Sequence, residues 1–192
     1  MLLSLTFLSC NKEDITTQLT NKNPNIRVYE STTLNMFNRA SYDEPCKTTT
    51  LIAGQHHVAG TVTVDTDGDN LILTYATADG WTIGLTHFSI GNCDEQWVPT
   101  TGNGNPKVGH FEHTEPHSQD INEVVYLISL DALVEAYCFA AHAEVNGPTG
   151  GETAWARDEN NILEFDGNNW ATYVEALLSD CDIDGGGNDP NK

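Results

Sequence analysis

The chain has 192 residues, and 28 acidic against 8 basic side chains give it a formal charge of −20. This charge repels nucleic acid and anionic lipid headgroups, so it argues against nucleic-acid binding. Hydrophobic residues make up 39% of the chain and charged residues 19%, which excludes a disordered polyelectrolyte and fits one domain with tails. The acidity itself favours solubility, with attraction of divalent cations as the alternative explanation.

The first ten residues are apolar and end in a small residue followed by a cysteine. Phe7-Leu8-Ser9-Cys10 resembles a lipobox, the site where a signal peptide over residues 1–9 is removed and Cys10 receives acyl chains such as palmitate. Asn11-Lys12-Glu13-Asp14 is similar to the short acidic export signal of surface lipoproteins in some Gram-negative bacteria. The resemblance implies a lipoprotein of the outer membrane that faces the extracellular side. Each buried methylene contributes about 0.8 kcal/mol, so several acyl chains would hold it there.

No lysine or arginine precedes the apolar segment, so we expect the true start of the protein a few residues upstream. A buried first strand or helix is the alternative, but the polar residues 11–25 could not continue either element. Residues 10–48 are rich in Asn, Thr, Lys and Ser, which predicts a flexible, lipidated tether. Within it, residues 26–29 are a candidate edge strand.

After the tether, apolar and polar residues alternate in a series of short segments. Strands are predicted at 58–64, 71–77, 81–90, 122–130, 137–145, 151–156 and 169–178, with a structured loop as the alternative for 151–156 and a helix for 169–178. The pattern predicts an all-β, antiparallel β-sandwich over residues 49–180, with a small β-barrel as the alternative and a disordered tail over 181–192. The glycine- and proline-rich segment 91–120 is predicted to be a long loop, a length that is unusual unless the loop is functional.

Four cysteines remain besides Cys10, and in an exported domain they predict two disulfides with three possible pairings. Cys46 and Cys181 flank the folded region, and the two ends of a domain often lie close together. We therefore expect the pairs Cys46–Cys181 and Cys93–Cys138, each stabilising the fold by roughly 4 kcal/mol because each closes a long loop. A metal site is the alternative, although the Cys-x-x-Cys pair typical of one is missing.

A set of short motifs runs in order through residues 51–175. They are Ala53-Gly54-Gln55, Gly60-Thr61-Val62, Gly80-Trp81, Thr86-His87, Gly104-Asn105-Pro106, Ala141-His142-Ala143, Gly151-Glu152-Thr153-Ala154-Trp155 and Asn169-Trp170-Ala171-Thr172-Tyr173. Together they resemble a widespread extracellular bacterial domain without an assigned function. The resemblance implies an extracellular, β-rich module and carries over no catalytic residue.

Histidines form the first candidate site. His110, His113 and His117 lie in the predicted long loop, with Glu112 and Glu115 between them. Imidazoles at this density can capture zinc, copper or nickel, whereas a solvated polar loop is the alternative interpretation.

A second candidate site combines residues of several predicted strands. His87 and His142 are either core histidines with hydrogen-bond partners or part of a polar pocket with Gln55, Glu152 and Trp155. Acid–base chemistry in such a pocket would require Glu152 and His142 to approach within about 3 Å.

Two further features bear on ligands. The acidic segment Asp65–Asn70 resembles the start of a calcium loop, but Ala76 stands where that loop has its last glutamate, so a hairpin turn is the favoured interpretation. Of the four tryptophans, Trp97 is the best candidate for an exposed platform that stacks on sugars, because Asp94, Glu95 and Pro99 lie next to it.

The known catalytic motifs Gly-x-Ser-x-Gly, phosphate loop and His-Glu-x-x-His do not occur in the chain. We therefore expect a surface lipoprotein with a non-catalytic β-domain that binds a glycan or a protein partner, without a cofactor and without nucleic acid. The alternative is a metal-binding protein or metal-dependent hydrolase that uses the histidines with zinc, or a calcium ion at the acidic turn. A structural component of the envelope is the third possibility.

Overall fold

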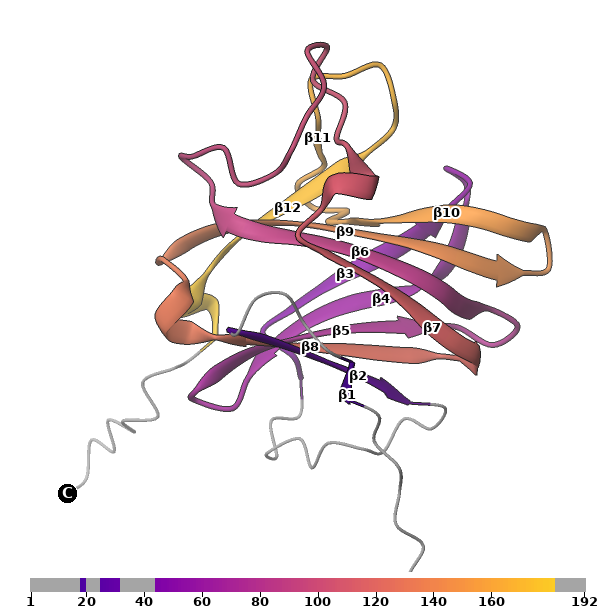
Figure 1. Ribbon diagram of the computed structural model, residues 1–192, viewed down its shortest axis with the longest axis horizontal. Coiled ribbons are helices and arrows are strands. Elements are labelled where there is room, and N and C mark those ends of the chain that lie inside the picture. The colour runs from indigo at the N-terminus through magenta and orange to yellow at the C-terminus, as the bar shows by residue number, and fades with distance from the viewer. Residues whose placement is uncertain (1–17, 20–24, 32–43, 182–192) are drawn as a thin grey trace, which may run out of the picture.

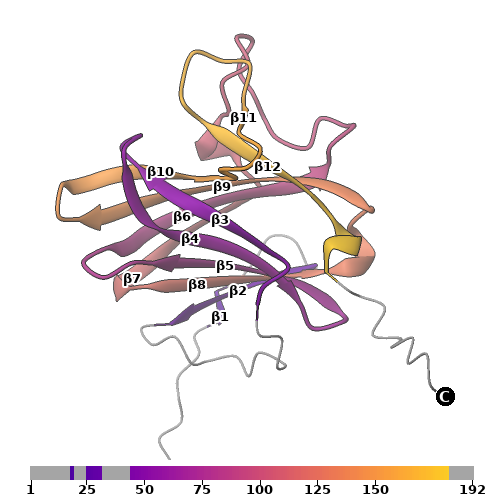
Figure 2. The same ribbon diagram turned by 180° about the vertical axis from the view of Figure 1, so that it is seen from behind.

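The structure, a computed structural model, describes residues 18–19, 25–31 and 44–181. These residues form the predicted all-β, antiparallel fold, and their sheet is nearly closed into a barrel shape (Figure 1 and Figure 2). The strands are β1 (Gln18–Leu19), β2 (Ile26–Ser31), β3 (Lys47–Ala53), β4 (His57–Thr66), β5 (Asn70–Thr77), β6 (Thr82–Asn92), β7 (His113–Ile121), β8 (Glu123–Ser129), β9 (Ala136–Gly147), β10 (Gly150–Arg157), β11 (Leu163–Glu164) and β12 (Thr172–Leu177). Three 3-10 turns, η1 (Val108–His110), η2 (Leu130–Ala132) and η3 (Leu178–Asp180), complete the described elements.

The sheet follows the order β1-β2-β8-β5-β4-β3-β10-β9 and continues through β6 to β7. Strand β9 has three partners, because β6 pairs along one edge while β12 and β10 share the other. At the far end of the path β7 comes back beside β2. We call the place where β7 and β2 meet the seam. Of the two architectures expected from the sequence, this single curved sheet corresponds to the barrel.

The inward faces of the strands form the main hydrophobic core. Alternation along each strand sends every second side chain into the barrel. On β5, Leu71, Leu73 and Tyr75 are fully buried in this way. Phe88 on β6 and Phe139 on β9 are equally buried, and their ring centroids lie 6.5 Å apart. The same alternation that identified these strands in the sequence therefore builds the interior.

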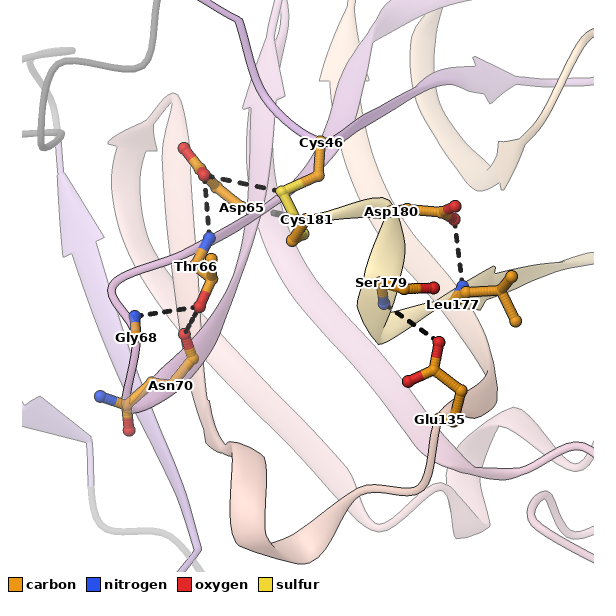
Figure 3. The surroundings of a disulfide bond; sticks show 10 residues. All are labelled: Cys46, Asp65, Thr66, Gly68, Asn70, Glu135, Leu177, Ser179, Asp180 and Cys181. Atoms are coloured by element: carbon orange, nitrogen blue, oxygen red, sulfur yellow. Dashed lines mark hydrogen bonds between the residues drawn. A yellow bond between two sulfur atoms is a disulfide. The ribbon is translucent and has the colours of Figure 1, made fainter. Parts of the chain in front are cut away.

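Both predicted disulfides are present, Cys46–Cys181 and Cys93–Cys138. The first joins the segment before β3 to the end of η3, next to the β4–β5 hairpin (Figure 3). There the carboxylate of Glu135 accepts a hydrogen bond from the backbone N–H of Ser179 at 3.2 Å (Figure 3). The two ends of the folded region are thus fastened to each other. The second disulfide joins the loop after β6 to β9.

Besides the two-residue strands β1 and β11, the sheet contains two longer strands that the sequence pattern does not predict, β3 and β7. Strand β7 occupies the last part of the expected loop over 91–120, so the irregular connection spans only residues 93–112. Its inward side chains are His113, Glu115 and His117, and it carries Pro116, so its composition is that of a polar loop. What makes it a strand is its pairing with β6, which the local sequence does not reveal.

The start of the sheet also differs from the expectation. Strand β2, the candidate edge strand, pairs with β8 along its whole length. The tether expected over residues 10–48 therefore overlaps the sheet at β1, at β2 and at the first residues of β3. Cys10, the signal peptide over 1–9 and the tail beyond Cys181 lie outside the described residues.

Candidate functional site

A second layer covers part of the outside of the barrel. Residues 93–112 and 158–171 pack over the outward faces of β6, β9, β10 and β12, and we call these two segments the outer layer (Figure 1, upper part). A hydrophobic cluster separate from the main core lies beneath them, formed by Val98, Phe111, Ala140, Trp155 and Ala171. Small outward residues on β9 let the layer approach closely: Ala140 is fully buried although it faces away from the barrel interior. β9 is consequently buried on both faces.

The outer layer is held in place by specific contacts. The Cys93–Cys138 disulfide ties its first residue to β9. Asn105 joins the two segments, because its side-chain oxygen accepts a hydrogen bond from the backbone N–H of Asn169 at 3.2 Å. Gly91 on β6 leaves room for Trp97, since a Cβ atom at this glycine would lie 2.7 Å from the Cβ of Trp97.

A cleft of about 470 Å³ opens in the outer layer beside Trp97, and we call it the Trp97 cleft. Trp97, Phe165 and Tyr173 line it, with ring centroids 5.1 to 6.2 Å apart. The Cys93–Cys138 disulfide adds a further apolar wall. The cleft therefore offers three aromatic rings from two separate segments and a strand, held at close distance.

Carboxylates surround these rings. The charged residues that line the Trp97 cleft are all acidic: Asp94, Glu95, Glu164, Asp166 and Glu175. Every one of them is solvent-exposed. They come from the loop after β6, from β11 with the residues that follow it, and from β12. The cleft thus combines aromatic faces with hydrogen-bond acceptors of a single sign of charge.

A smaller hollow of about 350 Å³ lies on the other side of the Trp97 segment. It shares Gln96, Trp97 and Val98 with the Trp97 cleft and is otherwise lined by Ser89, Pro99, His110 and Glu112. The hydroxyl of Ser89 donates a hydrogen bond to the carbonyl of Trp97 at 3.0 Å, which helps to hold the dividing segment on β6.

The second predicted site is assembled only in part. His87, His142 and Trp155 do come together on the outer face of the sheet: the ring centroids of His87 and His142 lie 5.2 Å apart, and those of His142 and Trp155 lie 4.7 Å apart. Glu152 is three residues from Trp155 on β10, and residues three apart on a strand point to opposite faces. Gln55 lies exposed in the turn between β3 and β4. The carboxylate of Glu152 and the amide of Gln55 therefore do not join the histidines.

The two histidines of this group are uncharged at neutral pH. Burial, and to a smaller degree the neighbouring His87, lowers the pKa of His142 to about 3. Burial also lowers the pKa of His87, against an opposite effect of Glu144. The Nδ1 atom of His87 lies 3.0 Å from the hydroxyl of Thr114, whereas Nδ1 of His142 has no hydrogen-bond partner among the described residues. Their buried positions beneath the outer layer favour a packing role.

A buried polar chain at the seam escapes sequence reasoning altogether. His117 lies between the carboxylate of Glu30, 3.0 Å from its Nδ1, and the hydroxyl of Thr86, 2.6 Å from its Nε2. Thr86 in turn lies 2.7 Å from the hydroxyl of Tyr126. This order of carboxylate, imidazole and hydroxyl activates a nucleophile in hydrolases. Here Thr86 is fully buried and also engaged by Tyr126, which favours a structural role for its hydroxyl. The four hydrogen-bonded side chains join β2, β7, β6 and β8 across the seam.

Comparison with protein-family models, curated proteins and solved structures finds no match for this chain. The assignment of a function therefore depends on the geometry of the described residues. No helix among them has the length and apolar character to span a membrane.

The expected metal ligands are not brought together. His110 lies exposed on η1, while His113 and His117 point into the barrel from β7. In the turn at 65–70, the Oδ1 atom of Asp67 accepts hydrogen bonds from the backbone N–H groups of Asp69 and Asn70 at 3.0 and 2.7 Å. Within the part of the chain that the structure describes, no group of three or more His, Cys, Asp or Glu side chains could hold a metal ion.

Proposed function

We propose that this chain is a surface-anchored, non-catalytic binding protein that holds a glycan in the Trp97 cleft. The observation that supports the proposal is the meeting of Trp97, Phe165 and Tyr173 with exposed carboxylates in one concave site. Aromatic rings pack against the apolar C–H faces of sugar rings, and carboxylate oxygens accept hydrogen bonds from sugar hydroxyls. Aromatic side chains together with polar groups that fix the orientation of a ligand are typical of small-ligand sites.

The setting of the carboxylates supports a binding role over hydrolysis. Glycoside hydrolysis requires a carboxyl group that acts as an acid, and apolar surroundings prepare it for this role. The carboxylates that line the Trp97 cleft are instead exposed to solvent. We therefore favour a binding module over a hydrolase.

The position of the cleft suits attachment of the protein through its N-terminal segment. Strands β1 and β2 lie at one end of the molecule, whereas β11 and the outer layer lie at the opposite end (Figure 1). A lipid on Cys10 would place the barrel between the membrane and the cleft. The cleft would then face away from the membrane, toward extracellular ligands.

A glycan array tests the binding proposal. We expect the purified protein to bind a restricted set of glycans and the Trp97→Ala variant to bind them at least tenfold more weakly, because the stacking surface is lost. Trp170→Ala is the matched control, since Trp170 packs in the outer layer but does not line the cleft. Equal affinity of Trp97→Ala and the unaltered protein would contradict the assignment of the site, and the absence of any glycan ligand would contradict the function.

Membrane fractionation tests the anchor separately. We expect Cys10→Ala to move the protein from the membrane fraction into the soluble fraction, because acyl chains would be its attachment. Retention of the variant in the membrane fraction would contradict lipidation at Cys10.

A further inference from the structure

We propose that the Trp97 cleft selects ligands that carry a positive charge, so that its glycan is one with free amino groups. This inference rests on the proposed glycan-binding function and narrows it to a class of ligand. Its basis is the combination of aromatic walls with carboxylates, in a cleft whose lining contains no lysine or arginine.

The aromatic walls give the first half of the argument. A cation placed over the face of a tryptophan or tyrosine ring is attracted by the ring's electron density. Trp97 and Tyr173 line the cleft together, with ring centroids 5.8 Å apart and their planes inclined at 58°. An ammonium group that enters the cleft therefore meets two ring surfaces that are not parallel to each other.

The carboxylates give the second half. Asp94 and Glu95 lie in the loop after β6. Glu164 lies on β11, Asp166 follows it, and Glu175 lies on β12. The basic side chains of the neighbouring strands do not neutralise them: Lys47 on β3 pairs with Asp158, and Arg157 on β10 pairs with Glu159, each at 2.8 Å. An ammonium group can donate three hydrogen bonds to these oxygens, whereas a neutral acetamido group lacks the charge.

The same arrangement disfavours competing ligands. Acidic sugars and phosphates would bring negative charge next to carboxylates of the same sign, and such a juxtaposition opposes binding. The cleft is also formed before a ligand arrives, because the Cys93–Cys138 disulfide holds Asp94 and Glu95 near β9 and the pairing of β11 with β12 holds Glu164. A preformed site loses less conformational entropy on binding.

A matched pair of probes tests the inference. Calorimetry at about pH 6, where amines of this kind are protonated, compares a β-1,4-linked glucosamine tetramer with the N-acetylated tetramer of the same length. We expect the amino form to bind at least tenfold more tightly and its affinity to fall as salt is added, since screening weakens the attraction between charges. Equal or tighter binding of the neutral tetramer would overturn the charge inference and leave the glycan proposal standing.

Two double variants separate the cleft from the general acidity of the chain. Glu164→Gln with Glu175→Gln removes two charges from the cleft, and we expect it to abolish most of the preference for the amino form. Asp131→Asn with Glu135→Gln removes two exposed charges that do not line the cleft and should leave the preference unchanged. An equal loss in both variants would show that only net charge matters, which would overturn the inference.

A probe without any sugar distinguishes the two proposals if neither tetramer binds. Tetramethylammonium carries the positive charge alone, and quenching of tryptophan fluorescence reports its entry. Saturable quenching that is lost in Trp97→Ala would uphold a cation site while the glycan proposal fails. Absence of that quenching, together with absence of tetramer binding, would overturn both.

Discussion

The barrel interior and the outer layer bury aromatic side chains in two different ways. Inside, rings such as Phe88 and Phe139 are fully covered by strands on all sides. At the outer layer, Trp97 and Phe165 are covered only in part, as is Tyr173 on β12 beneath them, and a cleft remains beside the three rings. Strands β6 and β9 belong to both regions, because the inner face of each strand borders the barrel core and its outer face lies beneath the outer layer. The difference teaches that one sheet can supply stability from its inner face and a binding surface from its outer face.

The two disulfides provide the largest expected contrast between these regions. Cys46–Cys181 closes a separation of 135 residues and Cys93–Cys138 one of 45. The loop-entropy model predicts losses of about 5 and about 4 kcal/mol in the free energy of unfolding when each pair is replaced by serine. Denaturant titration measures both losses. We expect only the Cys93/Cys138 variant to lose ligand binding as well, and loss of binding in the other variant while it is folded would contradict the separation of the two regions.

Replacing one ring in each region gives the next largest effect. Phe88→Ala leaves a cavity among Tyr126, Phe139 and His113 and should cost about 3–5 kcal/mol of stability. Phe165→Ala, at a half-buried position, should cost less than that and weaken ligand binding instead. Urea unfolding and calorimetric binding on both variants check the prediction. A larger stability loss for Phe165→Ala would place the main packing energy in the outer layer.

The buried polar chain at the seam predicts a smaller change. Thr86→Val keeps the shape of the side chain but leaves His117 and Tyr126 without their shared hydroxyl. Because the Nε2 atom of His117 and the hydroxyl of Tyr126 then lose this partner in a buried position, we expect a loss of about 1–3 kcal/mol in the free energy of unfolding. Thr49→Val is the control, since this buried hydroxyl donates only to the carbonyl of Val62. Equal losses of stability in the two variants would mean that the hydroxyl of Thr86 contributes no more than a single buried hydrogen bond does.

The smallest effect is the dependence of stability on pH. Burial lowers the pKa of His142 to about 3, and the pKa of His87 and of His117 is also lowered by burial. The unfolded chain therefore binds protons below about pH 6.5 that the folded protein does not, so stability falls as the pH falls. Between about pH 6.5 and 5.5 we expect His142 to contribute about 1 kcal/mol to this loss. Thermal unfolding of His142→Phe should show a shallower profile, and an unchanged profile would exclude His142 as its source.

Much of the barrel could be predicted because its information is local. The alternation in 58–64 and 71–77 identifies the β4–β5 hairpin without any knowledge of its neighbours. Strand β7 shows where this reasoning stops: its inward residues are polar because they meet Tyr126, Thr86 and Glu30 rather than an apolar core. The partners lie on β6, β8 and β2, far away in the sequence.

The candidate site divides in the same way. Trp97 could be selected from its acidic neighbours alone, and the structure does place it in a cleft. Phe165, Tyr173 and the carboxylates of β11 and β12 could not, because they reach Trp97 only through the packing of the two outer segments. Of the two interpretations of His142, the structure favours the core histidine over the polar pocket with Glu152, since Glu152 lies on the opposite face of β10 from Trp155, the strand neighbour of His142.

By itself, the sequence determined the all-β class and the strands with regular alternation, because strand periodicity is a local property. It left three pairings of the four cysteines open, and the nearness of domain ends favoured the one that the structure contains. The tertiary structure alone decided that the sheet nearly closes, that β7 is a strand and that three distant aromatic residues meet in one cleft. These features depend on contacts between residues far apart in the chain, and such contacts leave no periodic trace in the segments that make them.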